Sequence, residues 1–218
     1  MMDFFDLQKR TLVGRVIPKN AFDAYTNTKQ KKLFTDCIKR ITWTHKLSPE
    51  TVNLNGKDIK EIQVFKVELK KRSDISKVLE IVNKAIPYHL VFWTEFEDDA
   101  FISTASKHPH PTNGDIAVID WVFSSDWFKK DQNFYKFNLK GNLDSTFKDL
   151  CVQLTGKSEL ADKPMEDILQ NQQEIGRLKK EISKLKSAIS KSKQFNQKVE
   201  LNLELKKAEQ ELDKLLSA

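Results

Sequence analysis

The sequence predicts an α+β fold, in which a mixed β-sheet domain flanked by helices is followed by a C-terminal antiparallel helical hairpin of the coiled-coil type. Segments with two-residue apolar periodicity alternate with helical segments up to residue 162, whereas a seven-residue apolar repeat follows from residue 163. The composition is 39% hydrophobic and 31% charged, with fourteen Phe, which is enough for a core and excludes a disordered chain. We therefore expect a globular domain at 1–162 and a hairpin at 163–218.

The sequence of the first domain predicts helices and strands in mixed order. Ser73 can cap one helix, and Pro87 ends it. Acidic residues at 97–99 form the tip of a β-hairpin, and a Pro-rich loop at 107–114 precedes the last strand. The expected helices are 28–40, 73–86 and 143–154, and the expected strands are 41–47, 61–71, 88–96, 100–106 and 115–123.

Several classes of protein are not supported by the sequence. The N-terminal stretch MMDFFDLQKR lacks the basic flank and cleavage site of a signal peptide, and no segment is apolar enough to span a bilayer. We expect a cytoplasmic protein without a membrane partner. Cys37 and Cys151 lack metal-site spacing and are expected to be buried free thiols. Walker, GxGxxG, GxSxG and HExxH motifs are absent from the sequence.

Two heptad runs predict the hairpin. The first contains Ile168, Ile175, Leu178, Ile182, Leu185 and Ile189, and the second contains Leu201, Leu205, Ala208, Leu212 and Leu215. An antiparallel pair would bury both apolar stripes, with Phe195 closing the end of the seam at the turn. The alternative is one long helix that dimerises with a second copy, but Gln194 and Asn196 interrupt the apolar pattern and favour the hairpin.

Basic residues concentrate around the predicted turn. Residues 176–198 contain eight basic residues and one acid, Glu181, which gives about +7 for this segment. A surface of this kind suits the phosphate backbone of DNA, although a solvated face of a coiled coil has the same composition. The candidate nucleic-acid-binding residues are Arg177, Lys179, Lys180, Lys184, Lys186, Lys191, Lys193 and Lys198.

A nuclease is the alternative hypothesis. Glu68 and Lys70 form an acid-x-lysine triplet that resembles the catalytic strand of PD-(D/E)xK nucleases, with Asp58 as a candidate second acid holding Mg²⁺. Chance explains such a triplet equally well, because about four or five are expected at random and three occur. The preceding strand supplies no evident partner acid, so we expect neither a cofactor nor a metal in the preferred, non-catalytic interpretation.

The stretches ITWTHKLSPETVNL, EIQVFKVELK, KAIPYHLVF and KQFNQKVELNLELKK together resemble domain-of-unknown-function family 4391. The resemblance implies no reaction. It implies an accessory protein of prokaryotic restriction-modification or phage-defence systems, whose partners are a DNA methyltransferase and SNF2-type or restriction-type helicases. Gln194, Phe195 and Asn196, in the most specific of these stretches, are the candidate partner-binding residues.

Overall fold

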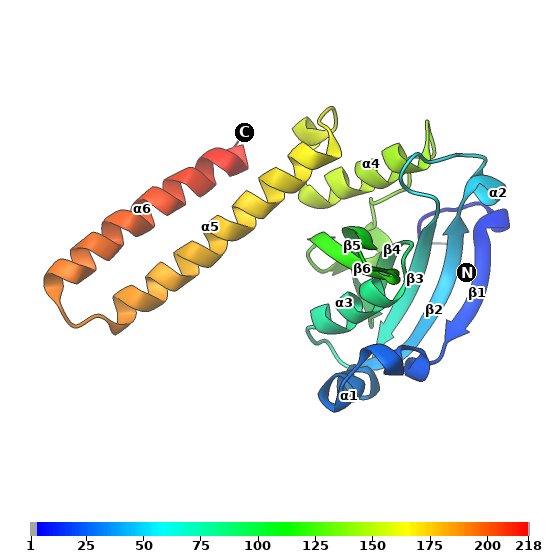
Figure 1. Cartoon of the computed structure of the whole chain (residues 1–218), viewed down its shortest axis with the longest axis horizontal. Coiled ribbons are helices and arrows are strands. Elements are labelled where there is room, and N and C mark those ends of the chain that lie inside the picture. The colour runs from blue at the N-terminus through cyan, green and yellow to red at the C-terminus, as the bar shows by residue number, and fades with distance from the viewer. Residues whose placement is uncertain (1–3, 218) are drawn as a thin grey trace. The chain divides into compact units, whose positions relative to one another are not determined.

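The computed structural model describes residues 4–217, apart from the side chains of residues 113–115 and 217. Residues 1–3, with which the acidic N-terminal stretch begins, lie outside this range. The chain divides into two compact units, Met1–Asp162 and Lys163–Ala218. The first contains a mixed sheet with flanking helices and the second contains a pair of helices, so the predicted α+β class is confirmed (Figure 1). Over the described range, no helix is both long and apolar enough to cross a membrane.

The sheet of the first unit has the strand order β1-β2-β3-β4-β5-β6, with β7 paired to β5. All neighbouring strands are antiparallel except β3 and β4, which are parallel and are joined through helix α3 (Ser76–Ala85). The strands are β1 (Leu12–Ile17), β2 (Ile38–Leu47), β3 (Ile62–Leu69), β4 (His89–Phe96), β5 (Asp99–His110), β6 (Asn113–Ser124) and β7 (Phe128–Lys129).

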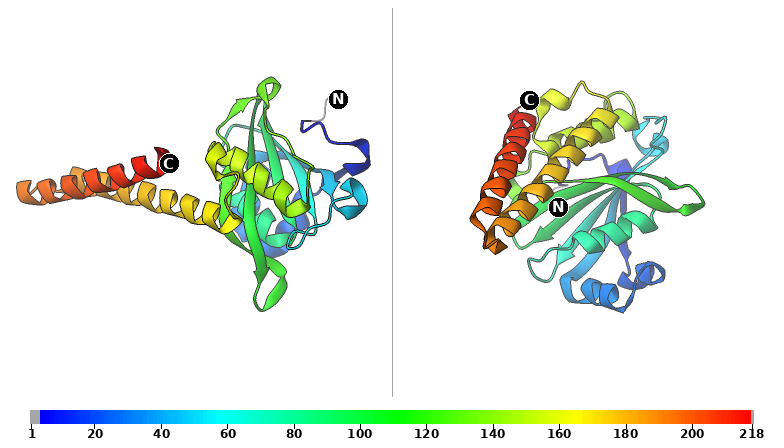
Figure 2. Two further views of the ribbon diagram at one scale, coloured as in Figure 1. Left: turned by 90° about the horizontal axis from the view of Figure 1, so that it is seen from above. Right: turned by 60° about the vertical axis from the view of Figure 1, so that its left-hand side comes forward.

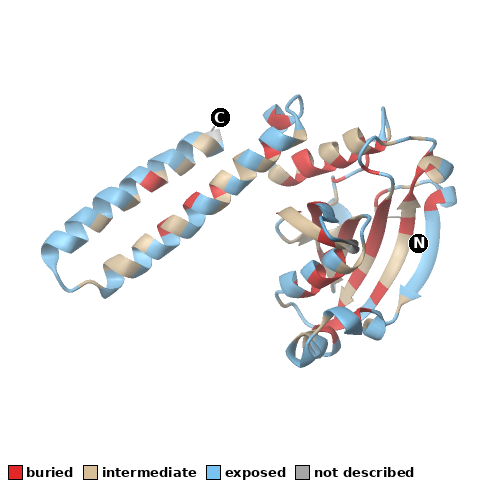
Figure 3. Ribbon diagram, viewed as in Figure 1, coloured by how far each residue is buried: buried red, intermediate tan, exposed pale blue. Residues whose placement is uncertain are grey.

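Helix α3 and helix α1 (Thr28–Cys37) cover one face of the sheet. Phe65 of β3 and Phe92 of β4 project into this layer and pack with Val78 of α3; all three are at most 1% exposed. Apolar residues of α3 recur at three- and four-residue spacing, which places them on the side that faces the sheet. Figure 3 shows the resulting buried bands along the strands and α3.

Helix α4 (Leu143–Thr155) covers the opposite face of the sheet, as the turned views in Figure 2 show. His89 alternates with the core residue Leu90 on β4 and therefore points to the α4 side, where its ring meets Phe147 at 4.6 Å between centroids. Cys37 and Cys151 are buried and free, as predicted.

Asp144, in the first turn of α4, fixes the loop before β3. Its carboxylate accepts hydrogen bonds from the main-chain N–H groups of Lys57, Asp58 and Ile59, at 2.6, 3.0 and 2.9 Å. Burial pushes the pKa of Asp144 upward, but these hydrogen bonds outweigh it, so the pKa is lowered. Gly56 is required nearby, because a Cβ at this position would lie 1.9 Å from the oxygen of Ile59.

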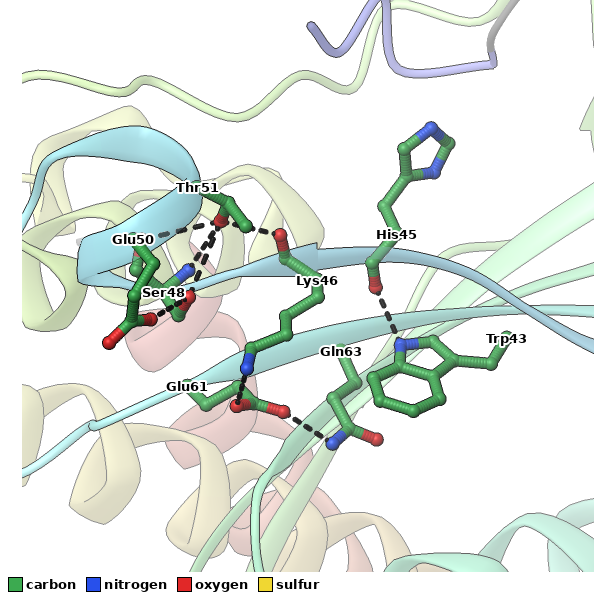
Figure 4. A network of polar contacts seen from close by, with 8 residues as sticks. All are labelled: Trp43, His45, Lys46, Ser48, Glu50, Thr51, Glu61 and Gln63. Atoms are coloured by element: carbon green, nitrogen blue, oxygen red, sulfur yellow. Dashed lines mark hydrogen bonds and ion pairs between the residues drawn. The ribbon is translucent and has the colours of Figure 1, made fainter. Parts of the chain in front are cut away.

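The other end of the β2–β3 connection is closed by a network of polar contacts (Figure 4). Lys46 pairs with Glu61 at 3.1 Å, and Gln63 donates to the same carboxylate. Thr51 donates its hydroxyl proton to the oxygen of Lys46 at 2.7 Å. These two contacts satisfy both carboxylate oxygens of Glu61, so this cluster stabilises the turn rather than presenting a free acid.

Short helical segments complete the first unit. They are α2 (Pro49–Val52) and the 3-10 turns η1 (Lys9–Thr11), η2 (Lys19–Tyr25), η3 (Lys130–Gln132) and η4 (Ser158–Leu160).

Two local predictions are wrong. Ser73 does not cap α3, because the helix begins at Ser76 and the carboxylate of Asp74 accepts the N–H of Ser76 at 2.9 Å. The predicted loop 107–114 lies mostly within β5 and β6, which continue past Pro109 to a turn at 111–112. Pro109 has no N–H to donate, but this costs no hydrogen bond on the β4 side of β5, because β4 pairs with β5 only up to Thr104.

Candidate functional site

The second unit is an antiparallel pair of helices, α5 (Met165–Lys191) and α6 (Phe195–Ser217) (Figure 1). Both predicted heptad runs contribute to its core, which explains the stripe of buried and half-buried residues along the two helices in Figure 3. The predicted fold-back hairpin is confirmed. Its core consists of Leu178, Ile182 and Ala208, against which Leu185, Leu205, Leu212 and Leu215 pack.

The turn at residues 192–194 is held by local hydrogen bonds. Ser192 N donates to the oxygen of Ala188 at 2.9 Å and closes α5, while the Ser192 hydroxyl donates to the side chain of Gln197 at 2.8 Å. Because α5 has 27 residues, it is about 40 Å long. The turn therefore lies at the far end of the hairpin from Met165, where α5 begins.

Phe195 does not close the seam, contrary to the sequence prediction. It is the first residue of α6 and is 78% exposed. The reason is helical geometry: six residues before Leu201 correspond to roughly 600° of rotation, which places Phe195 about 120° away from the seam. The ring is therefore available at the surface.

An exposed apolar stripe extends from Phe195 along the outer side of α6. Val199 is 43% exposed and Leu203 is 57% exposed, and both follow Phe195 at four-residue intervals. Residues spaced by four lie one above the other on a helix surface. The sequence interpretation recognised only Phe195, although the spacing in FNQKVELNL is sufficient to identify all three residues.

The eight predicted DNA-binding residues differ in whether their charge is already neutralised. Arg177 pairs with Glu174 and Glu181, each at 2.7 Å, and the hydrogen bond that Arg177 donates to Glu174 raises the pKa of Arg177. Lys186 pairs across the hairpin with Glu209 at 2.9 Å. The remaining six are exposed and have no ion-pair partner among the described residues: Lys179, Lys180, Lys184, Lys191, Lys193 and Lys198.

The three residues of the nuclease hypothesis are not brought together. Asp58 lies in the loop before Ile62, whereas Glu68 is near the other end of β3, about 20 Å along the strand from Ile62. Glu68 instead pairs with Arg40 on β2 at 2.5 Å. Burial pushes the pKa of Glu68 upward, but Arg40 and Lys66 outweigh it, so the pKa is lowered.

Lys70 has a contact of its own at the end of α1. Its ammonium donates to the main-chain oxygen of Thr35 at 2.8 Å, and Lys19 donates to the oxygen of Ile38 at 2.6 Å. Carbonyl groups in the last turn of a helix lack intrahelical partners and attract cations. Among the side chains that the structure describes, no group of three or more His, Cys, Asp or Glu has the arrangement of a metal site.

Cations near the ends of the central strands also face acids. Lys66 pairs with Glu95 at 2.7 Å and lies 4.8 Å from the ring centre of Trp93, while Lys129 pairs with Asp99 at 2.7 Å. Arg72 contacts the same Asp99 carboxylate at 3.2 Å. These pairs neutralise Lys66, Lys129 and Arg72, in contrast to the six unpaired lysines of the hairpin.

These features define an α+β protein with a mixed sheet and a coiled-coil hairpin that carries unpaired basic residues and an exposed apolar stripe. The chain belongs to the family described as Domain of unknown function (DUF4391), whose model matches residues 5–212. The predicted family resemblance is thus confirmed over nearly the whole chain. Neither the curated proteins nor the solved structures contain a significant match.

Proposed function

We propose that this protein is a non-catalytic accessory subunit that acts in the prokaryotic cytoplasm within a restriction-modification or phage-defence complex. Its hairpin contacts DNA phosphates, and the exposed end of α6 docks to a DNA methyltransferase, a helicase, or both. The six exposed lysines without ion-pair partners carry the DNA part of the proposal. The identity of the partners rests on the family resemblance alone.

The salt dependence of DNA binding tests the first part. If all six lysines contact phosphates, a plot of log affinity against log salt has a slope of about −5, because each contact releases about 0.9 counterion. Reversing Lys191, Lys193 and Lys198 to Glu should reduce the slope by about 3 and weaken binding about tenfold or more, for every DNA sequence tested. Fluorescence anisotropy with a labelled duplex between 25 and about 200 mM salt measures both quantities.

A matched control separates local contact from net charge. Lys206, Lys207 and Lys214 are also exposed on α6 but lie outside the basic segment 176–198. Reversing these three residues changes the net charge by the same amount and should alter the affinity much less. Equal losses in the two triple variants, or no binding by the wild type at low salt, would contradict a DNA role for the hairpin.

Docking is tested by co-expression with the candidate methyltransferase and helicase. Phe195, Gln194 and Asn196 are exposed at the hairpin turn, and an exposed aromatic residue is a common anchor of protein interfaces. Replacing Phe195 with Ser should abolish co-purification, whereas Leu216→Ser, on the same helix and 49% exposed, should not. If the wild type co-purifies with neither enzyme, the accessory-subunit proposal is contradicted.

The same purified protein tests the nuclease alternative. We expect no cleavage of DNA with Mg²⁺ or Mn²⁺, because Glu68 is paired with Arg40 and lies far along β3 from Asp58. Metal-dependent cleavage that disappears in Glu68→Gln and Lys70→Ala would overturn the non-catalytic proposal. These two variants should leave DNA binding unchanged.

A further inference from the structure

Strand β6 forms one edge of the sheet, because its outer side pairs with no strand among the residues that the structure describes. Unpaired N–H and C=O groups along such an edge can accept a further strand, and proteins usually protect long edges with Lys, Pro or a short strand. The opposite edge strand, β1, has six residues and includes Arg15. Strand β6 has twelve residues, contains no Lys, Arg or Pro, and has an unbroken apolar run at 116–119. The edge of β6 therefore lacks these protections.

The ladder between β5 and β6 shows which main-chain groups of β6 point outward. The N–H of Ser125 donates to the oxygen of Ile102 at 2.9 Å, and the register continues without a shift along the adjoining residues of β6. In an antiparallel ladder, residues that bond to the neighbouring strand alternate with residues whose N–H and C=O point away from it. The N–H of Phe123 therefore faces β5, whereas the main-chain groups of Val122 and Ser124 point to the free edge.

These outward groups are accessible. Val122 is 44% exposed, and Ser124 is also exposed. Apart from the ladder to β5, the main chain of neither residue has a hydrogen-bond partner among the described residues. The edge of β6 can therefore form main-chain hydrogen bonds to an added strand at these two positions.

A groove runs beside the same edge. A cavity of about 780 Å³ lies between β6 and α3, and a second cavity of about 420 Å³ adjoins it, since Ser76, Phe101 and Ser124 line both. The shared wall residues make the two cavities one elongated groove. Leu79 of α3 and Val122 of β6 belong to its largely apolar wall. An elongated groove beside an open strand edge fits an extended chain better than a compact ligand.

The Lys, Arg, Asp and Glu side chains that line the groove already have partners. Glu80 pairs with Lys84 at 2.5 Å. Arg72 pairs with Asp99 at 3.2 Å, and the carboxylate of Asp74 accepts an N–H at the start of α3 at 2.9 Å. The wall therefore offers an occupant no uncompensated charge, so it complements an uncharged segment and disfavours a highly charged one such as a nucleic-acid strand.

We propose that this groove binds an extended, uncharged segment of a partner protein, which adds a strand to β6 and places apolar side chains, at every second position, against Leu79 and Val122. In strand addition of this kind, the main-chain hydrogen bonds supply affinity and the alternate side chains supply specificity. The site consists of residues of the first unit, so it does not depend on whether the hairpin contacts DNA or docks an enzyme.

Peptides with methylated main-chain nitrogens test for strand addition. The probes are end-blocked peptides in which Val, Leu or Phe alternates with Thr, and calorimetry measures their affinity for the full chain. The best binder is then N-methylated on alternate residues, in two isomers that block opposite edges of the peptide. Because only one edge bonds to β6, one isomer should bind at least about tenfold more weakly than the parent and the other should bind nearly as well. Equal affinities of the two isomers would overturn the proposal.

Amide hydrogen exchange locates the bound peptide. In the free protein, the N–H of Phe123 should already be protected by β5, whereas the N–H groups of Val122 and Ser124 should exchange rapidly. Saturating peptide should slow exchange at Val122 and Ser124 at least about tenfold and leave Phe123 unchanged. Rapid exchange at Val122 and Ser124 with the peptide bound would contradict pairing with β6.

Val122→Lys provides a variant of the protein itself. Lys is common on protected edges, and this position is exposed, so the fold should be kept while a charge enters the apolar groove and weakens the peptide at least about tenfold. Val122→Thr keeps the branched shape and should bind like the wild type. If Val122→Lys does not fold, the two tests on the wild type still decide.

Three further outcomes would overturn the proposal. One is the absence of binding by every probe at millimolar concentration. Another is wild-type affinity in a folded Val122→Lys variant. The last is a dimer of the free protein in which the amides of Val122 and Ser124 are already protected, because a second copy would then occupy this edge.

Discussion

Raising the pH from 7 to 9 should stabilise the sheet unit, because Lys107 loses a buried charge in the folded state. Lys107 is 5% exposed and donates to the main-chain oxygens of Asn83 and Ile86, both at 2.7 Å. Burial lowers the pKa of Lys107 from 10.5 to about 7. The unfolded chain keeps this proton until about pH 10.5. Between pH 7 and 9 the unfolded state therefore binds more protons than the folded state, and the free energy of unfolding rises with pH.

The magnitude follows from the size of the shift. A difference of 3.5 units between the two pKa values corresponds to about 5 kcal/mol over the whole window, and the part between pH 7 and 9 is about 2 kcal/mol. These are upper values, because the two carbonyl oxygens at the end of α3 favour the charged ammonium. His89, whose pKa is lowered to about 4 by burial and by Lys107, does not titrate in this range.

The assay compares urea unfolding of the wild type and of Lys107→Met at pH 7, 8 and 9, followed by tryptophan fluorescence. Cys151 acts in the opposite direction, because burial raises its pKa and the unfolded thiol ionises first. The difference between the two proteins removes this contribution, since both contain Cys151. The wild type should gain about 2 kcal/mol relative to the variant between pH 7 and 9. Parallel pH profiles would refute the reasoning.

Two further predictions concern single contacts. Ile182→Ala should destabilise the hairpin by about 2–4 kcal/mol, because it opens a cavity in the core of the hairpin. Circular dichroism should then show loss of helix at a lower temperature, while the unfolding of the sheet unit, followed by tryptophan fluorescence, is unchanged. Loss of both signals at the same temperature would contradict the expectation that the two units unfold independently. Asp144→Asn should weaken the anchor of loop 57–59. Because the pKa of Asp144 is lowered, the stability difference between the wild type and Asp144→Asn should be complete above about pH 4 and should diminish as the pH falls further; a difference that does not change with pH would contradict the assigned role of the carboxylate.

The sequence predicted the elements whose periodicity is strong. The heptad spacing of Ile182 and Leu205 and the alternation around Trp43 were sufficient for the hairpin and for β2. Strand β1 was missed because its residues are almost all exposed, so LVGRVI has no alternation of apolar and polar residues, and Gly14 has a positive φ of 66°.

The candidate sites were less predictable, because they depend on contacts between residues distant in sequence. The charges of Lys179 and Lys186 look alike in the sequence, and only the position of Glu209 on the facing helix distinguishes the paired lysine from the unpaired one.

The parallel pairing of β3 and β4 has a consequence for the rate of folding. A parallel pair cannot be joined by a tight turn, so the centre of the sheet forms only after the intervening chain through α3 has crossed over, which is an entropically costly loop closure. The contacts of the hairpin, by comparison, can form one after another outward from the turn at residues 192–194, where the two helices are closest in sequence. Stopped-flow measurements should therefore resolve a fast helical phase from the hairpin and a much slower phase, reported by Trp93 on β4, from the sheet.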